Sequence, residues 1–444
     1  MKATMQELTR KTAVPGPRSK ALLDEWKKWE SQVTGFQAPV VLDHGKGVIL
    51  TDVDGNEYWD WTSGVLVANL GHSHPDHVAA IQAQAARLLN CYDVPTAERI
   101  NAAKALCGVT PQNLDKAFFM TTGAEAVEAC IRVARRATGN FEIISFQGGF
   151  HGRTYASMSV GGLSGVKKQY GPLMAGVINV PYPNPYRPFC GITSDEALVD
   201  ATFELMENQI RAQSTGSLAA VLIEPYQGAG GFLFPPEGFL PRLEKWARDK
   251  GLIFIIDEVQ ASFGRTGKWF CSEWEGLTPH LMSIGKGIGS GVPTSAMAAE
   301  SGVMECMHKG EMSSTCGGNP LSSAACIAAI DIIKRENLVE NARKVGEVLK
   351  SRLKGIQENS KYLGDVRGRG LVIGLEIVKD RKTKEPSADL TKKIILTAAS
   401  KGLLMGPVGV FGNVIRVAPP LVVTEDQAHA MADIFADALA EVEK

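Results

Sequence analysis

The sequence lacks any long hydrophobic run. None of its windows approaches the roughly 20 consecutive apolar residues that a membrane-spanning helix requires. The first residues, MKATMQELTRK, also lack the apolar core of a secretory signal peptide. We therefore expect a cytoplasmic protein with no membrane partner.

Neither sign of charge is in excess. Lysine and arginine together number 47, aspartate and glutamate number 48, and the formal net charge is −1. A chain with so little net charge has no overall field that attracts nucleic acid or an anionic membrane. The charge balance therefore predicts a small-molecule partner and no nucleic acid.

The eight cysteines form no CxxC pair, and several lie inside apolar segments such as AVEACIRVA. Zinc sites and redox motifs require paired spacing, so neither a metal site nor a redox site is predicted. Scattered cysteines in apolar surroundings are typical of reduced, packed thiols in a cytosolic protein.

What the sequence does contain is an alternation of helical segments with short apolar runs. From about residue 100 these runs are KAFFM, EIISF, LAAVLI, LIFII and LMSI, with room for a crossover helix between them. The alternation predicts an α/β domain with a mostly parallel sheet between helices. Before it, residues 47–61 alternate apolar and polar side chains around Asp54-Gly55, which indicates an antiparallel hairpin.

A chain of 444 residues is long enough for two domains with a cleft between them. We assign residues 61–330 to a large domain. Residues 331–444, which are helical and then form short strands, give a smaller α/β domain. Residues 1–60 form an N-terminal segment that contributes to the small domain.

Polar residues follow the apolar runs, at the edge of a parallel sheet where ligands bind. LIFII ends at Asp257 and Glu258, and LMSIG ends at Lys286. Since neighbouring residues of a strand point to opposite faces, we expect Asp257 to face the site and Glu258 to be structural.

The segment TTGAEAVEA begins a helix at a glycine turn. A helix start offers free backbone N–H groups and a positive dipole end to an anion, most naturally a phosphate. The alternative is an ordinary helix capped by Thr122. The segment fits neither GxxxxGK[ST] nor GxGxxG, so a nucleotide site is disfavoured.

Lys286 lies among glycines in SIGKGIGSG, and is either a solvated loop residue or an amine in a pocket that lowers its pKa. Pyridoxal phosphate accounts for it, because that cofactor needs a lysine for its imine, a carboxylate for its pyridine nitrogen and a helix start for its phosphate. Asp257 is the carboxylate, with the pyridine nitrogen rather than a protein cation as its expected partner. Phe150 is the candidate aromatic that stacks on the ring.

The motifs TTGAEAVEA, FHGRT, IEPYQGAGG, IIDEVQASFGRTGKWF, GKGIGSGVP and TCGGNP occur in this order. The sequence thereby resembles the class III, or omega-type, pyridoxal-phosphate aminotransferases, in particular the 4-aminobutyrate type. The N-terminal LTDVDGNEYWDWTSG and GHSHP and the C-terminal GDVRGRG and NVIRVAPPL extend the resemblance over most of the chain. It implies the fold type I of pyridoxal-phosphate-dependent transferases. It also implies a homodimer, or a dimer of dimers, with active sites at the subunit interface.

The resemblance implies a role for each matching residue. Lys286 is similar to the imine-forming lysine and Asp257 to the partner of the pyridine nitrogen, and these two are the catalytic candidates. The remaining cofactor-binding candidates are Gly123 and Ala124 at the phosphate, Phe150 and His151 in FHGRT, Val259 and Gln260 against the ring, and Thr315, which reaches the phosphate of the neighbouring subunit. Ala124 stands where a serine is common, so one hydroxyl donor is missing.

Three further residues resemble the substrate-binding residues of the 4-aminobutyrate type. A guanidinium grips a carboxylate through two hydrogen bonds, so Arg416 is the candidate for the α-carboxylate. Glu224 neutralises Arg416 when the substrate lacks that group, and Arg153 reaches a distal carboxylate. The alternatives are a structural ion pair for Arg153 and an ordinary strand arginine for Arg416.

The predicted function is the transfer of an amino group from an amine or (omega-)amino acid to a 2-oxo acid, pyruvate or 2-oxoglutarate, by a ping-pong Schiff-base mechanism. An amino-acid racemase or epimerase of the same family is the alternative, because VPYPNPYRP resembles some of those isomerases. A non-catalytic relative would have lost Lys286 or Asp257, and both are present.

Overall fold

The structure is a computed structural model that describes residues 8–35 and 37–444. Residues 1–7 and 36 of the predicted N-terminal segment lie outside the described residues. Within those residues, no helix combines the length and the apolar character needed to cross a membrane.

A seven-stranded sheet in the order β4-β10-β9-β8-β7-β5-β6 forms the centre of the fold. Each predicted apolar run is one of its strands: β4 (Lys116–Met120), β5 (Glu142–Phe146), β7 (Leu218–Ile223), β8 (Ile253–Asp257) and β9 (Leu281–Ile284). Two strands were not predicted, β6 (Val177–Val180) and β10 (Ser295–Ala299). The neighbours from β9 to β6 pair in parallel, as predicted.

The strand β10 runs antiparallel to both β4 and β9. Between β9 and β10 the chain forms only a short 3-10 turn, η3 (Lys286–Ile288). A parallel return needs a crossover of about a dozen residues or more, so the shorter connection reverses the chain.

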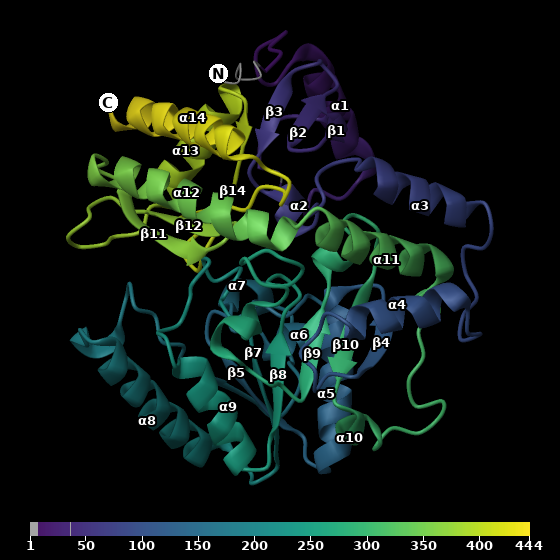
Figure 1. The fold of residues 1–444 in the computed structure, drawn as a ribbon. Helices are drawn as coiled ribbons and strands as arrows, with labels where there is room; N and C mark the ends of the chain where they lie inside the picture. Colours follow the sequence, from purple (N-terminus) through teal and green to yellow (C-terminus); the bar gives the residue numbers. More distant parts are fainter. Residues whose placement is uncertain (1–7, 36) are drawn as a thin grey trace.

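Helices cover both faces of this sheet. Alternate residues of one strand belong to different apolar clusters: Ile255 of β8 packs with the cluster that includes α5 (Gly123–Thr138). Its neighbour Phe254 packs with the cluster that includes α8 (Asp195–Gln213) and α9 (Phe239–Asp249). The central sheet is therefore buried between helical layers, as expected for a parallel sheet (Figure 1).

Two smaller sheets lie beyond the central one. The first, β1-β2-β3-β13, joins β1 (Leu42–Lys46), β2 (Ile49–Asp52) and β3 (Glu57–Asp60) to β13 (Leu403–Leu404). The second, β11-β12-β15-β14, is antiparallel and contains β11 (Leu363–Arg369), β12 (Val372–Ile377), β15 (Val414–Val417) and β14 (Gly406–Val408). The predicted hairpin is β2–β3, with Gly55 at φ +81° in its turn. Strands from the N-terminal and C-terminal parts of the chain thus share one sheet. The predicted domain boundaries remain predictions.

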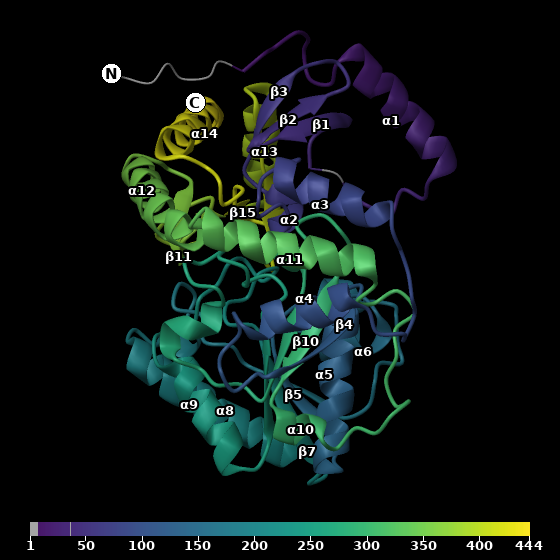
Figure 2. The same ribbon diagram turned by 45° about the vertical axis from the view of Figure 1, so that its right-hand side comes forward.

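The C-terminal helices α12 (Leu338–Glu358), α13 (Ala388–Ser400) and α14 (Glu425–Glu443) pack beside these sheets. The helix α11 (Pro320–Arg335) lies between them and the central sheet, in contact with α3, α4 and α12 (Figure 2). The remaining helices are α1 (Pro17–Trp29), α2 (Ser63–Leu66), α3 (Pro75–Ala85), α4 (Ala97–Cys107), α6 (Tyr155–Val160), α7 (Ser164–Lys167) and α10 (Ser301–Met304).

The apolar face that the sequence predicts for α9 is buried. Phe239, Leu243 and Ala247 are fully buried, whereas Trp246 is half-buried and donates its indole N–H to Glu207. The spacing of apolar residues at the helical period of 3.6 therefore predicted correctly which side of α9 is buried.

We expect Leu243→Ala to destabilise the protein by about 2–5 kcal/mol, because it leaves a cavity under α9. The matched control is Leu205→Ala on α8, where the side chain is 41% exposed and the cost is below about 0.5 kcal/mol. Thermal unfolding measures both variants. Equal melting temperatures would contradict the assigned packing.

Candidate active site

Nine of the predicted site residues line one cavity of about 250 Å³ at the carboxyl edge of the central sheet. They follow strands β4, β5, β7, β8 and β9 along the chain, so the parallel arrangement brings them together. The nine residues are Gly123, Ala124, Phe150, His151, Glu224, Asp257, Val259, Gln260 and Lys286. Gly152 and Ala229, which sequence reasoning missed, complete the lining.

Asp257 ends β8 with a carboxylate that is almost fully buried. Its Oδ1 accepts hydrogen bonds from the Ser283 hydroxyl (2.9 Å) and the Val259 N–H (3.0 Å), and its Oδ2 lies 2.7 Å from His151 Nδ1. A carboxylate has roughly four acceptor positions, so one position on Oδ2 stays open. The predicted partner of Asp257 is the pyridine nitrogen, and this stays a prediction; in the structure His151 also binds the carboxylate, and the open position is what a ring N–H requires.

His151 is the titratable partner of Asp257. Burial alone would lower the pKa of its imidazole, but the hydrogen bond to Asp257 and the nearby charges of Asp257 and Glu224 outweigh burial and raise that pKa. The imidazole binds one oxygen of Asp257 without blocking the last acceptor position of that carboxylate.

Ser283 is a site residue that sequence reasoning missed. It lies on β9 directly opposite Asp257 in the parallel register, and its side chain is fully buried. Within LMSIG it looks like one more residue of an apolar run. The sequence feature that could have identified Ser283 is its polar side chain within an apolar strand, because a buried hydroxyl needs a hydrogen-bond partner.

Lys286 opens the η3 turn with φ +49°, a left-handed conformation that costs energy for any residue with a side chain. Burial lowers the pKa of its amine, and the charge of Arg416 acts in the same direction, whereas Asp257 and Glu224 oppose them. Within residues 8–35 and 37–444, no hydrogen bond or ion pair occupies its Nζ. The amine is therefore free of protein partners, and burial favours its neutral form, which is the nucleophilic one.

The start of α5 serves both as a capped helix and as a donor site. Thr122 accepts from the Glu125 N–H (3.3 Å), and the Glu125 carboxylate accepts from the Thr122 N–H (2.8 Å), so the capping box is complete. The N–H groups of Gly123 and Ala124 have no partner among the described residues, and both residues line the cavity. These two donors at a positive helix end suit an anion.

The cavity contains one further unpaired polar group. The Gln260 Oε1 is buried and has no hydrogen-bond partner in the described chain. Gly228 makes room for it, because a Cβ at this position would lie 2.0 Å from that oxygen. A polar ligand group is therefore needed beside Gln260.

These open groups fit pyridoxal phosphate. The Gly123 and Ala124 N–H groups suit its phosphate, Asp257 its pyridine nitrogen, and the free Lys286 amine its aldehyde. Phe150 provides an aromatic face at the cavity.

Glu224 is fixed in the cavity wall. Its two carboxylate oxygens accept hydrogen bonds from the Phe150 N–H (2.8 Å) and the Gly228 N–H (2.9 Å). Burial raises the pKa of this carboxyl to about 7. No ion pair joins Glu224 to Arg416 within the described residues, so the predicted neutralising pair stays a prediction.

Arg416 projects from β15 and is only 5% exposed. Its Nε and Nη2 have no hydrogen-bond partner in the described part of the chain, and burial lowers the pKa of its guanidinium to about 10. Gly406 of the neighbouring strand leaves it space, because a Cβ there would lie 2.6 Å from Nη2. A buried cation without a partner is unstable unless an anion binds it.

Three predicted residues do not line the cavity: Arg416, Arg153 and Thr315. Arg153 is exposed and its guanidinium lies 5.8 Å from the centre of the Phe150 ring. Thr315 is exposed in the loop between α10 and α11. Within one subunit Arg153 lies over the ring of Phe150 but, like Thr315, does not line the cavity.

Glu258 takes no part in the cavity. It is fully buried and accepts hydrogen bonds from the backbone N–H groups of Cys271 (3.1 Å) and Ser272 (2.7 Å). The alternation of side chains along the strand thus separates the two acids into one that faces the cavity and one that holds the following turn.

Comparison with known proteins agrees with this geometry. Residues 31–439 match the family model described as aminotransferase class-III. The chain is 37% identical to the alanine/serine racemase of Pyrococcus horikoshii, over 96% of this chain and 91% of the relative. It is 36% identical to the 4-aminobutyrate aminotransferase of Mycobacterium tuberculosis, over 97% and 98%.

A solved amine transaminase from an uncultivated Pseudomonas species, in its pyridoxal-phosphate-bound form, has the same fold type I. The TM-score is 0.88 at 30% identity, and the match covers 93% of this chain and 98% of that chain. The chain therefore belongs to the class III aminotransferases, and its cofactor is pyridoxal phosphate.

Proposed function

We propose that this enzyme transfers amino groups between substrates that carry a carboxylate beside the reacting carbon: an α-amino acid as donor and a 2-oxo acid as acceptor. The observation that carries the proposal is the buried guanidinium of Arg416, whose Nε and Nη2 have no partner in the described chain. A substrate carboxylate supplies the missing anion in both half-reactions.

Pyridoxal phosphate, when bound, withdraws electrons from the substrate carbon through its protonated ring. Asp257 would accept a hydrogen bond from the ring N–H and so would keep that nitrogen protonated. His151, Ser283 and the Val259 N–H hold the carboxylate in place. The Lys286 amine would hold the cofactor at its aldehyde, and as a free amine would carry a proton away from the substrate carbon.

The fixed position of Glu224 favours donors with a carboxylate over simple amines. A guanidinium that meets a substrate without a carboxylate stays buried and unpaired unless a protein acid moves beside it. Glu224 would have to give up two backbone hydrogen bonds to do so.

A second candidate is amino-acid isomerisation, because an alanine/serine racemase is among the relatives. Returning a proton to the opposite face of the same carbon needs a second proton carrier or a mobile one. Of the ionisable side chains in the cavity, Asp257 and His151 bind each other and Glu224 is held by two N–H groups. The single free amine of Lys286 favours amino transfer.

The subunit arrangement is part of the proposal. Exposed apolar side chains gather at residues 88–100, including Leu88, Leu89, Tyr92, Val94 and Ile100. They adjoin a groove of about 520 Å³ lined by Ile100, Phe118, Met304, Met307 and Met312. We propose a second copy of this chain as the occupant. In this arrangement the exposed Thr315 of one subunit would bind the cofactor held by the other subunit.

Replacing Lys286 by alanine should abolish transfer, with a loss of at least about 10³-fold, because the proton carrier is removed. The visible absorption of the purified holoenzyme should disappear as well. Lys245→Ala, at a lysine that is 75% exposed, is the control and keeps both properties. Substantial transfer by the Lys286 variant would contradict the assignment.

Arg416→Gln should lower kcat/KM for an α-amino acid donor about 10–100-fold, as expected when charged hydrogen bonds are lost. A primary amine without a carboxylate serves as the matched substrate, and its half-reaction should slow by less than about twofold. Single-turnover absorbance measures both. An equal loss for the two donors would mean that Arg416 does not bind the carboxylate.

Incubation of one enantiomer of an amino acid without any oxo acid separates the two candidate reactions. The aminotransferase releases at most one equivalent of oxo acid per site and leaves the remaining amino acid optically pure. Chiral chromatography measures both quantities. Catalytic loss of optical purity would establish the isomerase.

A further inference from the structure

A glycine-rich loop forms one wall of the cavity. We call residues 228–232 the wall loop. The Gly228 N–H donates to Glu224 (2.9 Å), Ala229 lines the cavity, and the missing Cβ of Gly228 leaves room for Gln260 Oε1. Any shift of the wall loop therefore changes the surroundings of Glu224 and Gln260 together.

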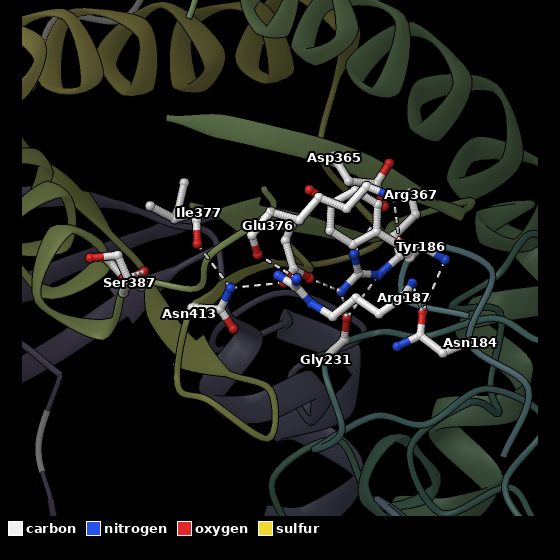
Figure 3. A network of polar contacts seen from close by, with 12 residues as sticks. Asn184, Tyr186, Arg187, Gly231, Asp365, Arg367, Glu376, Ile377, Ser387 and Asn413 are labelled. Carbon is white, nitrogen blue, oxygen red and sulfur yellow. Dashed lines mark hydrogen bonds and ion pairs between the residues drawn. The ribbon is translucent and has the colours of Figure 1, made fainter. Parts of the chain in front are cut away.

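The outer side of the wall loop is held by the C-terminal sheet. The Ala229 carbonyl accepts from the Gly409 N–H (2.9 Å). Arg367 on β11 donates from Nη2 to the Gly231 carbonyl (2.6 Å) and from Nε to the Gly231 and Phe232 carbonyls (both 3.1 Å), and Figure 3 shows it beside Gly231. One guanidinium thus binds two successive carbonyls of the loop.

The wall loop is strained where Arg367 holds it. Phe232 has φ +51° although it is fully buried, and Gly231 has φ +121°. The φ of Gly231 favours glycine, and a Cβ there would also make a tight contact of 3.2 Å with Arg367 Nη2. Such conformations persist only where the surrounding contacts fix them.

Glu376 on β12 fixes Arg367 in turn. Its Oε2 accepts from Arg367 Nη2 (2.7 Å), and its Oε1 accepts from Arg187 Nη2 (2.7 Å) and Asn413 Nδ2 (2.8 Å). Burial would raise the pKa of Glu376, but Arg367, Asn413 and Arg187 outweigh it and lower that pKa. Arg187 comes from the segment after β6 of the central sheet, so the glutamate joins parts of the chain far apart in sequence (Figure 3).

We propose that Arg367 and Glu376 are positioning residues for the reaction, because this pair, in which Glu376 is buried and Arg367 is 14% exposed, holds the wall loop against the cavity and so sets the positions of Glu224 and Gln260. The inference rests on the proposed function for its effect on turnover. It also predicts effects on cofactor binding that need no turnover.

Arg367→Lys is the main test. Lysine keeps a positive charge beside Glu376 but cannot bind Glu376 and two carbonyls at once. We expect kcat/KM to fall on the order of 10–100-fold, the cost of a displaced site wall. The affinity of the apoenzyme for pyridoxal phosphate should fall at least about threefold, since Gln260 is displaced. Arg352→Lys, in an exposed pair with Asp433, is the matched control and should change both by less than about twofold.

The pH dependence of the holoenzyme absorption distinguishes positioning from a loss of stability. The Gly228 N–H stabilises the ionised form of Glu224, and His151, Asp257 and Lys286 are the other titrating groups that face it. Losing that hydrogen bond raises the pKa of Glu224, so the inflection that Glu224 contributes to the pH profile should move to higher pH. Arg352→Lys should leave the inflection in place.

A lowered melting temperature with unchanged cofactor affinity and an unchanged inflection would overturn the proposal. If Arg367→Lys does not fold, Glu376→Gln carries the test, because the amide keeps the shape and one acceptor oxygen. If the wild type transfers no amino group while Arg367→Lys still shifts affinity and inflection, the proposed function fails and the positioning role stands.

Discussion

The rest of the site depends on the need to stabilise one buried charge, that of Asp257. A carboxylate that is 5% exposed must find hydrogen-bond donors inside the protein. Its donors come from the segment after β5, from the turn that follows β8 and from β9. The strand order of the central sheet brings them to one point. Because they occupy all but one acceptor position, the same arrangement stabilises the charge and leaves it available to a ligand.

Much of the fold could be predicted from local sequence, because the apolar runs and the polar residues that end them are set by burial along each strand. The antiparallel β10 was missed because its direction depends on the length of a connection rather than on its own residues. The site prediction succeeded for residues at strand ends, such as Asp257 and Lys286. It missed Ser283, a lone hydroxyl within an apolar run, and Arg153 and Thr315 do not reach the cavity in one subunit.

The contacts that position the wall loop could not have been predicted at all. Arg187 and Glu376 are separated by 189 residues. No local sequence pattern at either residue indicates that the two form a pair. Buried ion pairs are weak evidence of stability, because desolvation offsets much of their attraction. Their geometric effect is clearer: three segments that share one carboxylate cannot move independently. The position of the wall loop in the active site therefore depends on the C-terminal sheet, which lies outside the cavity.

The pairing of β3 with β13 joins residues near the two ends of the chain. During synthesis, the central sheet is available once the chain has passed residue 299, whereas the N-terminal sheet stays incomplete until residues 403–404 have emerged. The hairpin made first is thus among the last elements to gain its final neighbour, and its open edge is exposed throughout the intervening time. The contacts that link these two segments can form only once residue 404 has been synthesised, so they are among the last to become possible.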